Sequence, residues 1–148
     1  MSSLNDAKGE IQRADHLLYV TLKYTRTIDV MKSIIVRLTN AYDNAIIFAL
    51  EKLKSKKKLK EIPLSPVSRA ELLRDLKKRD IIILDALNNY FLLRKISHAE
   101  YTKREEFRKN VTLTVMHKDE AIEINIKTLE EYYNRTKEFV DYINEKFE

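Results

Sequence analysis

The sequence feature that most constrains the fold is an unbroken apolar stripe between Thr27 and Lys54. Its main members recur at steps of three and four residues: Ile28, Met31, Ile35, Leu38, Tyr42, Ala45 and Ala49. Four further apolar residues widen it: Ile34, Ala41, Ile46 and Phe48. No Gly or Pro interrupts the segment, so the spacing predicts one helix about 42 Å long. Because so wide a stripe needs neighbours on several sides, we expect this helix at the centre of a bundle.

Three other segments show helical periodicity. The first covers residues 4–24, and the last runs from a capping pattern at Thr128 and Glu131 to the C-terminus. The last helix has one apolar face: Leu129, Tyr132, Tyr133, Thr136, Phe139, Val140 and Ile143. Between them, a helix begins at Pro66, a favoured first position. Its predicted core face is Leu73, Leu76, Ile83, Leu87, Tyr90 and Phe91, with deep burial expected across residues 81–84.

Two later segments are harder to interpret. Ser97 and Glu100 have capping-box spacing, which predicts a new helix or a bend from His98 through Arg108. Residues 111–126 alternate β-branched and polar residues, which favours a short β-hairpin with its turn at 117–120. An extended loop or a helix are the alternatives, because a lone hairpin is marginal in water. We therefore predict a mainly α, up-and-down bundle of four to five helices with a hairpin near 111–126.

The chain length of 148 residues favours a single domain over residues 1–148. An exposed lysine-rich linker covers about 52–66, where Pro63 and Pro66 stop any helix. No apolar run approaches 18 residues, so we expect no membrane span and a cytoplasmic domain. Abundant Lys and Glu with few thermolabile residues is typical of heat-adapted organisms.

Composition excludes several classes of site. The chain has no Cys, which excludes disulfides and thiolate chemistry. The only glycine is Gly9, so neither glycine-rich phosphate loop can form. His16, His98 and His117 have no metal-ligand spacing. We therefore expect no metal and no cofactor.

Charge is unevenly distributed along the chain. Residues 25–66 carry +5 and residues 67–110 carry +4, whereas residues 111–148 carry −4. Such a basic middle can hold phosphates with salt-dependent affinity. The candidate anion-binding or nucleic-acid-binding residues are Arg37, Lys56, Lys57, Lys58, Arg104 and Arg108.

Each of these candidates also has a structural interpretation. The three lysines suit a solvated loop as well as a phosphate contact. Arg37 borders the apolar stripe, where a buried carboxylate commonly holds an arginine. Arg104 and Arg108 would lie one turn apart on a helix and suit a phosphate, but Glu100 and Arg104 would equally form an i,i+4 pair.

Self-association is a further expectation. Ile34, Ile46 and Ile47 widen the central stripe to an arc that exceeds what a few helices of one chain are expected to cover. We therefore predict a homo-oligomer, with a homodimer as its simplest form. The eight tyrosines fall mostly on or beside the apolar stripes, which favours core packing over base stacking.

The segment Arg94-Lys95-Ile96-Ser97-His98, within a series of long helices, resembles the HEPN superfamily of helical domains. That family contains dimeric and RNA-cleaving members, and its motif is an Arg followed by four to six residues and then His. The resemblance implies Arg94 and His98 as catalytic residues. The stretches 22–27 and 106–111 also resemble small archaeal proteins without an assigned activity.

Two functions follow from these observations. The first is a non-enzymatic helical binding or scaffold protein whose partner is a protein or a nucleic acid. The alternative is a HEPN-like domain that binds or cleaves RNA through the basic middle of the chain. We expect weak, sequence-independent binding and no cleavage, because only three residues separate Arg94 from His98.

Overall fold

A computed structural model describes residues 2–147 and is mainly helical, with a small three-stranded antiparallel sheet. The elements follow one another along the chain as α1 (Ser3–His16), the π-helical turn η1 (Leu17–Thr21), α2 (Leu22–Thr25), α3 (Ile28–Ser55), α4 (Pro66–Leu76), α5 (Ile81–His98), β1 (Glu100–Arg104), β2 (Thr112–His117), β3 (Glu120–Ile124) and α6 (Ile126–Phe147). The predicted mainly helical fold is thus confirmed. The first predicted helix is a continuous rod formed by α1, η1 and α2.

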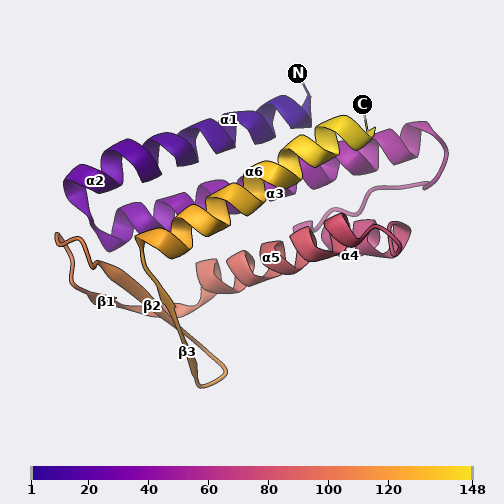
Figure 1. Cartoon of the computed structure of the whole chain (residues 1–148). Helices are drawn as coiled ribbons and strands as arrows, with labels where there is room; N and C mark the ends of the chain where they lie inside the picture. The colour runs from indigo at the N-terminus through magenta and orange to yellow at the C-terminus, as the bar shows by residue number, and fades with distance from the viewer. Residues whose placement is uncertain (1, 148) are drawn as a thin grey trace.

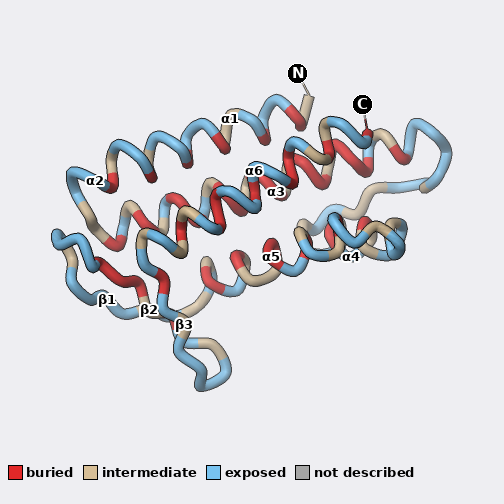
Figure 2. The backbone as a smooth tube through the Cα atoms, viewed as in Figure 1, coloured by how far each residue is buried: buried red, intermediate tan, exposed pale blue. Residues whose placement is uncertain are grey.

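Helix α3 is the central element, as its wide apolar stripe predicts. It packs against every other helix of the described chain. Figure 1 shows α1 and α5 running opposite to α3, whereas α6 runs alongside α3 in the same direction. Figure 2 shows the buried residues of α1, α3 and α6 facing one another. Both Ile34 and Ile46 are fully covered by the chain itself, so they offer no surface for the predicted homodimer.

The apolar face of α6 closes the core against α3. Every member of the predicted stripe on α6 is buried, and the ring of Phe139 stacks on that of Tyr42 at 5.0 Å between centroids. The helix begins three residues before the start that a cap at Thr128 predicts. Asn125 Oδ1 accepts the backbone N–H of Thr128 at 2.9 Å, and Thr128 Oγ1 accepts the N–H of Asn125 at 3.4 Å. Asn125 therefore caps the helix, with Thr128 at the third helical position.

The predicted third helix is two helices, because Asp80 starts a new one. Its Oδ1 accepts the backbone N–H groups of Ile82 and Ile83 at 3.1 and 3.2 Å, which makes it the N-cap of α5. The chain turns between α4 and α5, and the apolar run at 81–84 straddles this corner. Only Ile83 is buried, whereas Ile81 is 71% exposed and Ile82 is 51% exposed. The expected deep burial of this run is therefore wrong.

The predicted helix from His98 to Arg108 is also wrong. Helix α5 continues through His98, the backbone becomes extended at Ala99, and residues 100–104 form strand β1. This strand exists because β2 pairs with it, with Glu100 opposite Met116 and Arg104 opposite Thr112. Cross-strand pairing thus overrides a local capping pattern that one sequence segment cannot distinguish from a helix start.

The predicted hairpin is confirmed as β2 and β3. Leu113 lies opposite Ile124 and Val115 opposite Ile122, and these residues form the face that turns toward the helices. A two-residue turn at Lys118 and Asp119 joins the strands. Both residues have positive φ, at 49° and 65°, as a type I′ hairpin turn requires.

This turn yields a stability prediction. Asp119→Gly should raise the free energy of unfolding by about 1 kcal/mol, because glycine adopts the left-handed region without the steric cost of a Cβ. Asp119→Ala is the matched control and should give no gain. Urea denaturation of the two variants beside the wild type measures the difference. Equal stabilities for the glycine variant and the wild type would contradict the turn geometry.

The loop between β1 and β2 fixes the sheet to the start of α3. The N–H of Phe107 donates to the carbonyl of Arg26 at 2.9 Å. Glu106 Oε2 accepts the N–H of Ile28 at 3.1 Å, which places a carboxylate at the positive end of the α3 dipole. This loop therefore lies at the N-terminal end of α3, at the left of Figure 1.

Candidate functional site

A cleft of about 480 Å³ lies where the end of α5 meets the β2–β3 turn and the start of α4. We call it the basic cleft. Its lining is Val67, Phe91, Arg94, Lys95, His98, Ala99, Met116, His117 and Lys118. Three of these side chains are cations, two are imidazoles and none is a carboxylate. The cleft therefore combines positive charge with an apolar wall.

Helix periodicity and strand register together build the basic cleft. Phe91, Arg94, Lys95 and His98 share one face of α5, because residues three and four apart are neighbours on a helix. Strand β1 follows α5 directly, and its first residue, Glu100, pairs with Met116. The end of β2 is thereby brought back beside the end of α5. This return places His117 and Lys118 in the same cleft as His98.

Arg94 is held at the inner side of the cleft by residues of α3 and α5. Its Nη1 lies 3.9 Å from Asp43 Oδ2 and 3.5 Å from the hydroxyl of Tyr90. The guanidinium also lies over the Tyr90 ring, 5.9 Å from its centroid. These contacts restrict the position of Arg94. Asp43 itself is not among the residues that line the cleft.

Asp43 and Tyr90 form a hydrogen-bonded pair beside Arg94. The Tyr90 hydroxyl donates to Asp43 Oδ1 at 2.5 Å. Burial raises the pKa of Asp43, although the hydrogen bond from Tyr90 and the charges of Arg94 and Arg69 oppose this rise. Burial and the Asp43 carboxylate both raise the pKa of the Tyr90 hydroxyl. Tyr90 therefore stays a neutral hydrogen-bond donor at neutral pH.

Arg37 is part of a surface ion pair, not of the basic cleft. Its Nη1 lies 3.3 Å from Glu10 Oε2, and Arg13 Nη1 lies 2.9 Å from Glu10 Oε1. This arrangement is the ion pair that its position beside the apolar stripe predicts. The pair joins α1 to α3 and leaves Glu10 with two arginine partners.

Lys56, Lys57 and Lys58 follow the last turn of α3 and are exposed. Lys57 has φ 60°, and the N–H of Lys58 donates to the carbonyl of Leu53 at 2.9 Å. These residues therefore close the C-terminal end of α3 with a left-handed cap. The lysine-rich segment is shorter than predicted, because α3 continues to Ser55.

Arg104 and Arg108 lie at the opposite end of α3 from these lysines. Arg104 Nη2 is 3.3 Å from Glu123 Oε1, a pair that links β1 with β3 on the sheet surface. Arg108 is exposed in the loop that contacts the start of α3. Since α3 has 28 residues, about 42 Å of helix separates this loop from Lys56. The structure thus does not bring the predicted anion-binding residues together, and Arg104 and Arg108 do not share a helical face.

The sequence prediction identified Arg94 and His98 but missed Lys95, His117 and Lys118 as their neighbours. The signal that could have found them is the strand alternation of residues 112–117 together with a second strand after His98. Without β1, nothing in the sequence returns His117 to the end of α5. Among residues 2–147, no group of three or more His, Asp or Glu side chains is arranged to hold a metal ion.

Within residues 2–147, no helix combines the length and the apolar character that crossing a membrane requires. No protein family model, curated protein or solved structure matches this chain.

Proposed function

We propose that this protein is a non-enzymatic binding domain whose basic cleft takes the phosphate groups of a single-stranded nucleic acid. The observation that carries the proposal is the lining of the cleft, which contains Arg94, Lys95 and Lys118 and no carboxylate. Guanidinium and ammonium groups are the side chains that neutralise phosphates. The exposed Met116 and the half-buried Phe91 offer apolar surface to a base or sugar.

The shape of the molecule supports this role. The lengthwise packing of α1, α3, α5 and α6 supports the predicted up-and-down bundle, which would hold the cleft on a rigid frame. Phosphate contacts position a strand without reading its sequence. The binding should therefore be independent of base sequence. A cytoplasmic location and a heat-adapted, archaeal source stay predictions from composition and resemblance.

Reversing the charge of two lysines, either in the cleft or far from it, tests the proposed binding site. A fluorescent single-stranded RNA should bind the wild type at low salt, measured by anisotropy, and Lys95→Glu with Lys118→Glu should weaken binding at least about tenfold. Lys56→Glu with Lys57→Glu is the matched control, with the same charge change at the far end of α3. Equal loss in both double variants would assign the binding to overall charge and contradict the cleft.

Salt dependence gives a second measure of the same binding. Log affinity for single strands falls with log salt by about 0.7 per phosphate contact. Three cations in the cleft therefore predict a slope of about 2. A slope near zero, or no binding at low salt, would contradict the proposal and leave a protein partner as the ligand.

One observation favours a second candidate function, RNA cleavage, in which Arg94 and His98 keep the role that the HEPN-like resemblance implies and His117 lies in the same cleft. His98 and His117 line the same cleft, and two imidazoles can supply a general base and a general acid. In that reaction the base removes a proton from a ribose 2′-hydroxyl, whose oxygen attacks the adjacent phosphorus, and the acid protonates the departing 5′-oxygen. Gel analysis of incubated RNA tests it. Cleavage that disappears in His98→Ala and in His117→Ala would support this function, and intact RNA would exclude it.

A further inference from the structure

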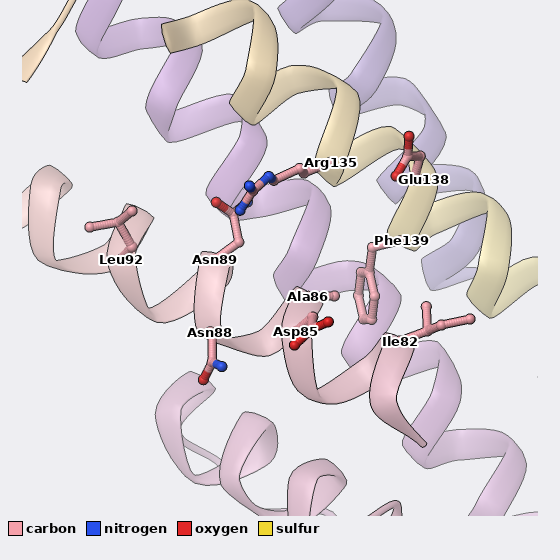
Figure 3. Close-up of a pocket in the computed structure, with 9 residues that line it drawn as sticks. All are labelled: Ile82, Asp85, Ala86, Asn88, Asn89, Leu92, Arg135, Glu138 and Phe139. Atoms are coloured by element: carbon pink, nitrogen blue, oxygen red, sulfur yellow. The ribbon is translucent and has the colours of Figure 1, made fainter. Parts of the chain in front are cut away.

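A second concave surface lies between α5 and α6, on a face of α5 distinct from that of the basic cleft. This α5–α6 groove has a volume of about 660 Å³ (Figure 3). Its walls include Ile82, Asp85, Asn89 and Leu92 from α5, and Arg135 and Phe139 from α6. The α5 members recur at steps of three and four, the pattern of a helix face that packs against another helix.

The floor of the groove holds a polar atom without a partner. The side chain of Asn89 is buried, and its Nδ2 donates to the hydroxyl of Tyr42 at 2.9 Å. Its Oδ1 has no hydrogen-bond partner. Figure 3 shows Arg135 reaching across the groove toward Asn89. An unsatisfied buried acceptor is costly, so a donor brought from outside the chain would be favourable here.

The rim of the groove carries opposite charges that the chain does not use. Asp85 stands on the α5 wall and Arg135 on the α6 wall, and among the described residues neither takes part in an ion pair. Beside them, Ile81 and Ile82 expose most of their apolar surface. Glu138 also lines the groove and takes part in no ion pair among the described residues, so the face carries two carboxylates, one guanidinium and a protruding isoleucine. A rotated copy of this face can place each Asp85 against the Arg135 of the other copy.

We propose that the α5–α6 groove is the interface of a two-fold symmetric homodimer. In this arrangement α5 of each copy lies antiparallel to α5 of the other, and the axis crosses the helix midway between the levels of Ile82 and Leu92. Ile82 of one copy then packs on Leu92 of the second copy, and Asp85 pairs with Arg135 across the axis. In this arrangement the exposed amide of Asn88 from the second copy supplies the donor that Asn89 Oδ1 lacks. The predicted self-association thus uses α5 and α6 rather than the covered stripe of α3.

Sedimentation at about 100 μM is the primary test, since dimer population depends on protomer concentration. The wild type should show twice the chain mass of 17.6 kDa. Ile82→Glu should show the mass of one chain, because the new carboxylate faces an apolar contact. Val36→Glu is the matched control, since Val36 is exposed at 45% on another helix, and it should remain dimeric. A monomeric wild type, or a dimeric Ile82→Glu, overturns the proposal.

A charge swap tests the predicted pairing directly. Asp85→Arg and Arg135→Asp should each weaken dimerisation at least about tenfold, and the double variant should restore most of the loss. Both residues are exposed, so circular dichroism should show unchanged helicity. Failure of the double variant to recover would contradict the antiparallel register. RNA binding by the monomeric Ile82→Glu variant should equal that of the wild type, which keeps this test separate from that of the basic cleft.

Discussion

Leu38→Ala should lower the free energy of unfolding by about 2–5 kcal/mol, the range measured when large aliphatic side chains are truncated in packed cores. Leu38 is fully buried in the middle of α3, which contacts all the other helices. The truncation removes apolar contacts and leaves a cavity that the surrounding side chains fill only in part. Urea denaturation followed by circular dichroism measures the loss.

Val36→Ala is the control for Leu38→Ala. Val36 lies on the same helix, two residues away, and is 45% exposed. Its truncation should change the stability by no more than about 0.5 kcal/mol. A loss below that value for Leu38→Ala would show that the central stripe does not carry the core.

The helices could be predicted from the sequence where one apolar stripe is long and its ends carry clear signals. The stripe of α3 and that of α6 are both buried as predicted. Periodicity over many residues averages out single exceptions, so such helices are robust predictions. The predicted first residues of the helices are less accurate, because the cap of α6 is Asn125 and not the predicted Thr128.

The turn between α4 and α5 could not be predicted from the sequence, because its position depends on the tertiary contacts of the two helices that it joins. The run Ile81–Leu84 is apolar in all four residues, yet Asp80 starts a helix there and leaves Ile81 in solvent. Apolarity alone does not distinguish a buried core turn from an exposed docking surface. The exposed isoleucines are instead consistent with the contact proposed for the α5–α6 groove.

The candidate site was least predictable, since it depends on pairing between distant segments. Tyr101 and Thr102 become strand residues only because β2 lies beside them in register. That pairing also places His117 in the same cleft as His98. Conversely, the lysines after α3 and the residues Arg104 and Arg108 all belong to the basic middle of the chain, yet the two groups lie at opposite ends of α3.

Asp80→Ala should lower the free energy of unfolding by about 2–3 kcal/mol, because this carboxylate has two structural roles. Its Oδ1 caps α5, and loss of a cap costs about 0.5–2 kcal/mol. Its Oδ2 accepts the Tyr142 hydroxyl at 2.6 Å and lies 3.9 Å from Lys146 Nζ, which joins α5 to α6. Asp80→Asn should lose less, because asparagine is an equally good cap, although its single oxygen cannot also accept from the Tyr142 hydroxyl.

The same carboxylate predicts how stability depends on pH in the alkaline range. The hydrogen bond to Asp80, followed by burial, raises the pKa of Tyr142 to about 12, against 10.0 for a free tyrosine. The folded state therefore keeps a proton that the unfolded chain loses. The stabilisation from this group is fully present below pH 10 and is lost as the pH rises toward about 12.

Spectrophotometric titration of the tyrosines, with unfolding measured at both ends of this range, separates the two roles of Asp80. In Asp80→Ala the pKa of Tyr142 should fall toward its ordinary value, and the part of the alkaline stability loss due to this tyrosine should disappear. Tyr142→Phe is the matched variant, since it removes the titrating hydroxyl but leaves the α5 cap in place. If Asp80→Ala costs no more stability at neutral pH than Tyr142→Phe does, then Asp80 does not stabilise the start of α5. The larger loss expected for Asp80→Ala instead assigns the difference to the cap together with the Lys146 ion pair, because the hydroxyl contact is absent from both variants.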